Sequence, residues 1–534
     1  MQIKYKLFTK ELSGIFTIPA GVITTETAIL ERIANEIPEI GILTTKSIGI
    51  KPKKGNKEPI IAQYSPFSFI NAVGLANPGP DEFAERLSKI KIPNDKFLLI
   101  SIFGSNEDEF REVAKKLYNW ADGFELNISC PHSDKYGQAV GQDYELVEKI
   151  VKKVSFLGKP IFIKISPNLD IKETIKHSLR GGIAGITAIN TKGPELYLHD
   201  NYPVLSNKVG GISGKAILEL GLKCVKEIRK LTDLPIIGCG GILRAQDAKK
   251  YKSAGANYFG IGSALAGMNT REIKEYFHNL MEDFEKETNS AESYLKNKLN
   301  MRYRKYEVEE NKRLADDLFT LKFSEKIKVN PGQFIFAWLP EKGEKPFSVF
   351  DDEPLTLLIQ KRGCFTNELS RLNKGDILYI RGPYGNSPQI NERILLVGGG
   401  TGIAALYLFA KRNPNTIAIL GARNQESLPY EKFKGVCKEI YLTTESGEIG
   451  QKGLSTDILE KIIKTTNPEC CINCGPKSMV AIAIEKENKY INPDNIYSSM
   501  EFSTKCGIGL CGSCATSKGY RGCVDGTFLT PEQF

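Results

Sequence analysis

Histidine is scarce in this chain of 534 residues, which contains only His132, His177, His199 and His278. A metal centre built mainly from imidazole ligands is therefore not expected. No apolar run approaches the roughly 20 residues that a membrane-spanning helix needs. The opening stretch, MQIKYKLFTKEL, lacks the pattern of a signal or transit peptide. We therefore expect a cytoplasmic protein with no membrane partner.

Charge of one sign does not dominate the chain. The formal net charge of +9 is spread along the sequence, and no basic arm is rich enough to indicate nucleic-acid binding. The excess could favour anionic substrates and cofactors, although a solvated lysine-rich surface also explains it. Internal repeats and low-complexity tracts are absent too. The 41% apolar fraction permits a sizeable core, and the length suits about three or four domains.

Four of the twelve cysteines crowd the C-terminal tail: Cys506, Cys511, Cys514 and Cys523. Their spacing is C-x4-C-x2-C-x8-C, and the first three match the plant-type 2Fe–2S pattern, in which thiolates hold both irons in a loop. A structural zinc site is the alternative, but such sites usually combine two short Cys-x-x-Cys pairs or mix Cys with His. The pattern predicts a 2Fe–2S cluster, and hence redox chemistry in a reducing compartment.

Residues 1–288 alternate β-rich runs with amphipathic helical stretches. Repeated βα units of this length predict a parallel sheet, and eight of them predict a closed (β/α)8 TIM barrel. A doubly wound open sheet is the alternative. The expected strands are 41–46, 69–75, 97–103, 123–129, 160–166, 185–190, 235–241 and 258–265.

The pattern changes in the second half of the chain. The polar stretch 289–303 is typical of a linker. Short alternating strands with Gly/Pro turns at 304–391 predict a small antiparallel β-barrel. Residues 392–494 return to βα alternation and predict an α/β domain, and 495–534 form the cluster domain.

Polar and glycine residues gather at the predicted strand ends of the barrel, where active sites of this fold lie. Three glycine-rich runs, 210–214, 238–242 and 260–264, place small residues where a phosphate could touch backbone amides. FMN is the natural candidate, and tight turns are the alternative for each run. The most informative candidate for a catalytic residue is Cys130, which lies between a strand end and Pro131. A thiol can accept a proton near neutral pH, whereas a buried packing cysteine is the bland explanation.

Together, NISCP, Lys46-Ser47, NAVGLANPG, FIKISPN, INT, GGISG and GCGGI resemble class 1 dihydroorotate dehydrogenase over nearly all of residues 1–280. The resemblance implies FMN at the barrel mouth. It also implies that Cys130 removes the C5 proton of dihydroorotate while C6 gives a hydride to the flavin. The implied substrate contacts are Lys46, Asn71, Ala72, Val73, Gly74, Leu75, Asn127, His132, Asn190 and Thr191. The implied FMN contacts are Ala20, Gly21, Lys46, Ser47, Asn127, Lys164, Ile189, Gly214, Gly240, Gly241, Gly262 and Ser263.

His132 departs from the asparagine that many family members have after the Cys-Pro pair. SCPH followed by GQD also resembles the pyrimidine-reducing barrel of dihydropyrimidine dehydrogenase. An NAD(P)H-dependent reductase of uracil or thymine is therefore the alternative function. A solvent-exposed loop histidine is the bland explanation of His132.

KPFSV (345–349) resembles the flavin-binding Arg-x-Tyr/Phe-Ser motif of ferredoxin-reductase-like proteins, with Lys345 in place of arginine. The implied FAD contacts are Lys345, Pro346, Phe347, Ser348, Phe365 and Thr366. LLVGGGTGIAAL (395–406) lets a backbone approach a pyrophosphate at a helix N-terminus. With CGPKSM (474–479), it gives the expected NAD contacts Gly398, Gly399, Gly400, Gly402, Cys474 and Gly475. Ordinary strand packing is the alternative for Cys474.

Residues 300–534 resemble the electron-transfer subunit of class 1B dihydroorotate dehydrogenase, here joined to the barrel. The resemblance implies oxidation of dihydroorotate to orotate in pyrimidine biosynthesis. Electrons would pass from FMN through 2Fe–2S and FAD to NAD, because flavins exchange electrons singly or in pairs. It also suggests a homodimer through the barrel. A third possibility is an electron-transfer protein that serves an external partner.

Overall fold

The computed structural model describes residues 5–129, 138–286, 299–390 and 393–534. The chain divides into two compact units. The first contains residues 1–299 together with Ile508–Ser513, and the second contains Asn300–Gly507 and Cys514–Phe534. The linker expected at 289–303 lies mostly outside the described residues. No helix in the described ranges is both long and apolar enough to cross a membrane.

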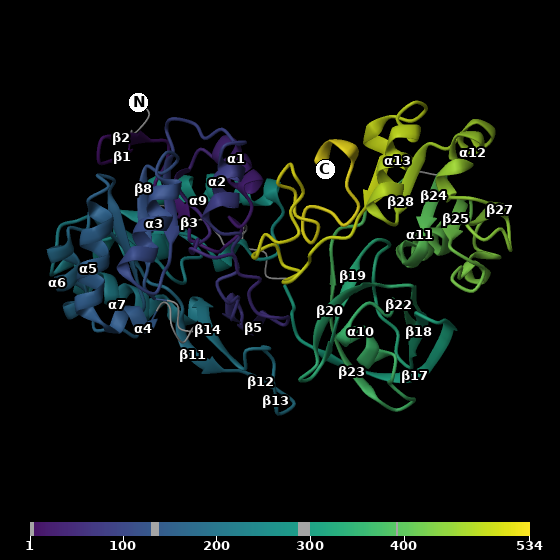
Figure 1. The fold of residues 1–534 in the computed structure, drawn as a ribbon, viewed down its shortest axis with the longest axis horizontal. Coiled ribbons are helices and arrows are strands. Elements are labelled where there is room, and N and C mark those ends of the chain that lie inside the picture. Colours follow the sequence, from purple (N-terminus) through teal and green to yellow (C-terminus); the bar gives the residue numbers. More distant parts are fainter. Residues whose placement is uncertain (1–4, 130–137, 287–298, 391–392) are drawn as a thin grey trace. The chain divides into compact units, whose positions relative to one another are not determined.

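Eight parallel strands close into a barrel in the first unit (Figure 1, purple to teal). The predicted (β/α)8 barrel is therefore confirmed. Around the barrel, and in chain order, the strands are β3 (Phe16–Ile18), β4 (Ile40–Thr44), β7 (Phe97–Ile102), β8 (Gly123–Asn127), β9 (Ile161–Ile165), β10 (Gly185–Ala188), β15 (Ile236–Cys239) and β16 (Tyr258–Gly260).

Helices alternate with the barrel strands, and their sequences explain their bounds. In α3 (Glu107–Leu117), Asn106 accepts hydrogen bonds from the first-turn backbone, and Phe110, Val113 and Leu117 form one buried face. The other helices of this unit are α1 (Thr27–Glu36), α2 (Pro80–Leu87), α4 (Gln138–Gln142), α5 (Tyr144–Ser155), α6 (Ile171–Gly181), η1 (Lys215–Ile217), α7 (Leu218–Arg229), α8 (Ala245–Ala254), η2 (Ser263–Leu265) and α9 (Thr270–Lys286).

One predicted barrel strand is wrong and one was missed. The run 69–75 contributes β6 (Ser68–Asn71) to a separate antiparallel sheet, of order β11-β14-β6-β5. The missed strand, β3, has three residues followed by Pro19, which is too short to show a period. The remaining strands of this unit are β1 (Tyr5–Leu7), β2 (Lys10–Leu12), β5 (Ile61–Ser65), β11 (Lys192–Leu196), β12 (Leu198–His199), β13 (Tyr202–Pro203) and β14 (Val209–Gly214).

The second unit begins with a seven-stranded antiparallel sheet, of order β20-β19-β23-β17-β18-β22-β21. The edge strand β20 also contacts β22, so the sheet curls towards closure, as expected for the small antiparallel barrel. Its elements are β17 (Arg304–Ala315), β18 (Leu318–Phe323), β19 (Phe334–Leu339), β20 (Gly343–Ser348), β21 (Asp351–Asp352), β22 (Leu355–Gln360), α10 (Cys364–Leu369) and β23 (Ile377–Tyr384).

A six-stranded parallel sheet follows in the second unit, of order β27-β26-β25-β24-β28-β29, as the βα alternation predicts. Its strands are β24 (Ile394–Gly399), β25 (Ile417–Ala422), β26 (Glu439–Thr444), β27 (Gln451–Lys452), β28 (Cys470–Cys474) and β29 (Ile496–Ser499). The helical segments are η3 (Gly400–Gly402), α11 (Ile403–Arg412), η4 (Tyr430–Phe433), η5 (Ser455–Asp457), α12 (Leu459–Thr466), α13 (Lys477–Glu487), η6 (Pro493–Asn495) and η7 (Pro531–Gln533).

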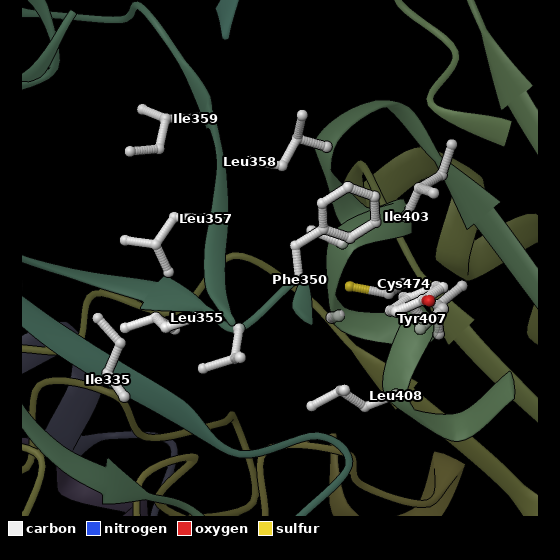
Figure 2. Packing of buried hydrophobic residues seen from close by; sticks show 14 of the residues in the cluster. Ile335, Phe350, Leu355, Leu357, Leu358, Ile359, Ile403, Tyr407, Leu408 and Cys474 are labelled. Carbon is white, nitrogen blue, oxygen red and sulfur yellow. The ribbon is translucent and has the colours of Figure 1, made fainter. Parts of the chain in front are cut away.

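One hydrophobic core joins the two sheets of the second unit. It includes Leu357 of β22, Phe350 before it, and Ile403 and Tyr407 of α11 (Figure 2). A second core covers the other face of the parallel sheet, where Leu395 and Ile419 pack with α12 and α13. The shared core fixes the antiparallel sheet against the glycine turn that opens α11.

Candidate functional site

The carboxyl ends of β4, β8 and β10 bring together several predicted site residues of the barrel. Ser47 follows β4, Asn127 ends β8, and Asn190 follows β10. The Asn127 side-chain amide donates to Ser47 Oγ (3.0 Å). The Asn190 amide donates to Ser129 Oγ (2.8 Å), and the Ser129 hydroxyl donates to Asn127 Oδ1 (3.1 Å). Side chains from three strands therefore form one hydrogen-bonded chain.

Two lysines lie at the same end of the barrel. Lys46 and Lys164 are nearly buried, at 7% and 4% exposure. An ideal Cβ built on Gly21 would lie 3.5 Å from Lys46 Nζ, so these two predicted FMN contacts are neighbours. Lys164 Nζ is 3.8 Å from the Glu125 carboxylate. Buried cations at a barrel mouth suit an anionic ligand.

Sequence reasoning missed Ser101, Glu125 and Ser129. The Ser101 hydroxyl donates to Glu125 Oε1 (2.9 Å) and lies 2.8 Å from Ser47 Oγ. The signal that could have found them is polarity inside an apolar strand. Ser101 interrupts FLLISI, and Glu125 interrupts GFELN, although all the residues of both strands are buried.

The predicted substrate residues 71–75 begin at the last residue of β6, outside the barrel sheet. Asn71 Nδ2 donates to the Gly211 carbonyl (3.3 Å), which ties the loop to β14. Asn56, another residue not foreseen, holds the next part: its amide donates to the Ala72 carbonyl (2.9 Å), and its backbone N–H donates to Val73 (3.0 Å). Leu75 closes the loop with a left-handed φ of 54°.

Some of the glycines expected to hold FMN are closely packed against the protein, and others face open space. An added Cβ at Gly241 would lie 2.8 Å from Leu218 Cβ and 2.9 Å from the Gly214 carbonyl. Close packing therefore explains the glycine at position 241. The same contact places the runs 210–214 and 238–242 side by side. At Gly262 the nearest atom is a Val22 methyl at 3.6 Å, so space remains open there. Gly262 fits close approach of a ligand to the backbone.

The remaining predicted FMN contacts, and the predicted substrate contact Thr191, lie around these groups. Ile189 donates its N–H to the Cys239 carbonyl (2.9 Å), and Tyr251 donates to the Gly240 carbonyl (2.8 Å). Ser263 opens η2, which contacts β14. Ala20 lies beside Gly21 after β3, and Thr191 follows Asn190. Cys130 and His132 lie outside the described residues.

The predicted FAD residues come from β20 and α10. Lys345, Pro346, Phe347 and Ser348 end the edge strand β20. The Phe347 and Phe365 rings are 6.4 Å apart between centroids and inclined by only 25°. The Thr366 hydroxyl accepts from the Arg362 N–H (2.9 Å), so it already caps its own turn.

The predicted NAD segments meet at the C-terminal edge of the parallel sheet. Gly398 pairs with Cys474 in neighbouring strands, followed by Gly399 and Gly475. An added Cβ at Gly402 would lie 2.4 Å from the Cys474 carbonyl, whereas nothing lies within 4 Å of one at Gly400. Cys474 belongs to the apolar core (Figure 2), and burial raises its pKa to about 12.

Three of the predicted cluster cysteines gather in the second unit. Cys514 Sγ and Cys523 Sγ are 3.4 Å apart, and Cys506 lies within hydrogen-bonding reach of Cys523. All three are buried. Over the described residues, however, no group of three or more His, Cys, Asp or Glu side chains has the geometry of a metal site. The 2Fe–2S cluster stays a prediction, supported by a donor set of thiols alone.

Cys511 belongs to the first unit, with the rest of Ile508–Ser513. Within that unit, the Ile23 N–H donates to the Leu510 carbonyl (2.6 Å), and Thr25 Oγ1 donates to the Cys511 carbonyl (2.6 Å). Ile23 has a φ of 61°, which a β-branched residue rarely adopts. The loop after β3, which carries Gly21, is thus held in an unusual conformation.

Comparison with known proteins assigns a family to the part of the chain that forms the barrel. Residues 2–283 match the family profile described as Dihydroorotate dehydrogenase. The catalytic subunit of dihydroorotate dehydrogenase B (NAD(+)) from Methanocaldococcus jannaschii is 41% identical over 254 residues, covering 46% of this chain and 82% of that protein. Its counterpart from Pyrococcus horikoshii is 38% identical over 288 residues, covering 53% of this chain and 93% of that protein.

A solved structure of an NADH-dependent reduced ferredoxin–NADP oxidoreductase also aligns. It is 31% identical in sequence, covers 43% of this chain and 88% of its own, and has a TM-score of 0.39. That score is too low to show a shared fold. The family assignment rests instead on the profile, which spans residues 2–283, and on relatives matched over 82% and 93% of their length. The chain belongs to the dihydroorotate dehydrogenase family and is an oxidoreductase.

Proposed function

We propose that this chain oxidises dihydroorotate to orotate at FMN held by the barrel, and passes the electrons through a 2Fe–2S cluster and FAD to NAD. One observation carries the first half of the proposal. Ser47, Asn127 and Asn190, matched to the family from separate stretches of sequence, form one hydrogen-bonded chain at the barrel mouth.

Each of the barrel residues would have a separate role in the oxidation. The planar amides of Asn127 and Asn190 suit a pyrimidine ring, whose edges both donate and accept hydrogen bonds. The Lys46 ammonium suits the ring carboxylate, which favours dihydroorotate over uracil. Cys130 takes the C5 proton. Bound FMN would supply the acceptor for the hydride at C6, so that the substrate would lose two electrons and two protons in total.

The second unit supplies the groups for the remaining transfer. Lys345 to Ser348 of β20, with the facing Phe347 and Phe365 rings, would hold FAD. The glycine turn before α11 and Gly475 would hold NAD, at a helix N-terminus that favours a pyrophosphate. Cys506, Cys511, Cys514 and Cys523 would ligate the cluster. We also propose that the barrels pair as a homodimer.

Anaerobic titration with dihydroorotate tests the proposal. The purified protein should contain FMN, FAD and one iron pair, and dihydroorotate should bleach the flavin absorbance before NAD restores it. Orotate should perturb the FMN spectrum and uracil should not. If uracil perturbs it and NADPH reduces uracil, the chain is a pyrimidine reductase. A protein that lacks FMN but transfers electrons from NADH would be an electron carrier for an external partner.

A further inference from the structure

We infer that Glu125 is a positioning residue for the chemistry at the barrel mouth. Its carboxylate is the last acceptor of the hydrogen-bond chain that runs from Asn127 through Ser47 and Ser101, and it offsets the charge of Lys164. The inference rests on the proposed function, because it assumes that this barrel binds FMN and dihydroorotate.

Glu125 lies inside the barrel with two polar partners. It is 1% exposed, and its register partner on β7 is Ser101, whose hydroxyl donates to it at 2.9 Å. Lys164 on β9 is the register partner of Asn127, two residues further along β8 on the same face. Its ammonium reaches the Glu125 carboxylate at 3.8 Å. A buried charge of this kind is tolerated only when paired.

The hydrogen-bond chain begins at a group that can only donate. The backbone N–H of Thr191 donates to Asn190 Oδ1 (2.9 Å), so the Asn190 amide nitrogen must face Ser129. Ser129 Oγ accepts that bond and uses its own proton to donate to Asn127 Oδ1 (3.1 Å). The orientation of both side-chain amides follows from this sequence of donors.

The chain ends at a group that can only accept. Asn127 Nδ2 donates to Ser47 Oγ (3.0 Å). The single hydroxyl proton of Ser101 is used on Glu125, so Ser47 must donate across the 2.8 Å contact to Ser101. An ionised carboxylate has no proton to donate. The backbone N–H groups of Thr191 and Ser129 fix the two amides. Glu125 fixes the direction of the last contact, in which Ser47 donates to Ser101.

That direction uses the Ser47 proton inside the protein, so Ser47 Oγ has no proton left for a bound flavin or pyrimidine ring. A glutamine at position 125 has nearly the same shape but can donate as well as accept. It would therefore allow Ser101 to donate to Ser47, which would free the Ser47 proton.

Charge is the second part of the inference. Beside Lys164 and Glu125 lies Cys239, whose pKa is raised to about 12 by burial, so its thiol is neutral at physiological pH. Glu125 is then the nearby anion that offsets the Lys164 ammonium. Without it, uncompensated positive charge favours the more negative reduced flavin. The midpoint potential of the bound FMN should become more positive.

Three variants of the full-length protein separate the two parts. Glu125→Gln removes the charge and the fixed direction, and Ser101→Ala breaks the chain but leaves the ion pair. Thr44→Val, which removes a buried barrel hydroxyl paired with Thr17 at 3.0 Å, is the matched control. FMN content, the FMN midpoint potential and the KM and kcat for dihydroorotate are measured for each.

We expect both test variants to raise KM about tenfold, as for one mismatched hydrogen bond. Only Glu125→Gln should shift the FMN potential, and Thr44→Val should change neither quantity. If wild-type protein binds no FMN or does not oxidise dihydroorotate, the proposed function fails. If wild type is active but Glu125→Gln keeps its KM and potential, the inference about Glu125 is wrong. Should Glu125→Gln not fold, an unchanged KM in Ser101→Ala would overturn the inference.

Discussion

The Arg381 guanidinium and the Glu344 carboxylate form a two-point ion pair inside the second unit. Arg381 Nε lies 2.7 Å from Glu344 Oε1, and Nη2 lies 2.8 Å from Oε2. Nη1 donates at 3.0 Å to both the Tyr384 hydroxyl and the Cys506 carbonyl. The pair therefore ties β20 and β23 to the start of the cysteine-rich tail.

Breaking this pair should destabilise the second unit strongly. Arg381→Met leaves the Glu344 carboxylate buried and unpaired, which costs about 3–5 kcal/mol. Trp338 is buried in this unit, so urea unfolding followed by its fluorescence, in a Trp120→Phe background, reports the loss. The control is Arg393→Met, whose partner Glu469 is partly exposed and whose loss should cost at most about 1 kcal/mol. Equal costs for the two variants would contradict the prediction.

Two glycine substitutions should separate an effect on folding from an effect on FMN binding. Gly241→Ala should impair folding, because its φ is 78° and the new Cβ would meet Leu218 at 2.8 Å. Gly262→Ala, at a φ of −124° with open space, should keep the Tm of the FMN-free wild-type protein but lose FMN during purification. Thermal unfolding and a flavin assay measure both effects. Full FMN retention in Gly262→Ala would place the cofactor elsewhere.

Glu487 should make the stability of the second unit fall as pH rises. The side chain is buried beside Asn473 and Cys471, and burial raises its pKa to about 8. Between the unfolded value, near 4.5, and about 8, the folded state holds a proton that the unfolded state releases. Stability is then lost by up to about 1.4 kcal/mol per pH unit across that window.

Glu487→Gln should flatten this dependence, since its amide does not titrate. Urea midpoints at pH 5 and pH 8 test it, with Glu485→Gln on the exposed side of α13 as the control. The fall from pH 5 to pH 8 should shrink in Glu487→Gln and persist in Glu485→Gln. The same fall in all three proteins would assign it to other groups.

Cys130 should be required for proton removal from the substrate. Cys130→Ala should lower kcat about 10²–10⁴-fold, the usual contribution of a general base. Cys130→Ser should retain some activity that rises towards alkaline pH, because a hydroxyl is harder to ionise than a thiol. Stopped-flow reduction of FMN by dihydroorotate measures both rates. Unchanged rates in Cys130→Ala would remove its role as the base.

Cys514 should be required for iron. Cys514→Ser is expected to lose most of the iron and its visible absorbance while keeping FMN. Cys364→Ser, at the exposed start of α10, is the control and should keep both. Iron content equal in the two variants would argue against the cluster assignment.

Local sequence patterns were enough to predict most of the fold and the family. Seven barrel strands were predicted because each is a short apolar run ended by polar or glycine residues, a pattern that depends only on neighbours in sequence. The strand at 69–75 was misplaced because a buried antiparallel strand has the same local pattern. For β3, three residues before Pro19 give no period at all.

The sequence by itself determined which groups are available: the cysteines of the tail, the glycine runs, and Lys46, Asn127 and Lys164 at strand ends. Only the tertiary structure decided how they are connected. Ser101 and Glu125 are 24 residues apart in sequence, and Asn127 and Ser47 are 80 apart. Barrel closure brings them within 3.0 Å, and the direction of their hydrogen bonds depends on which atoms meet, which no local pattern encodes.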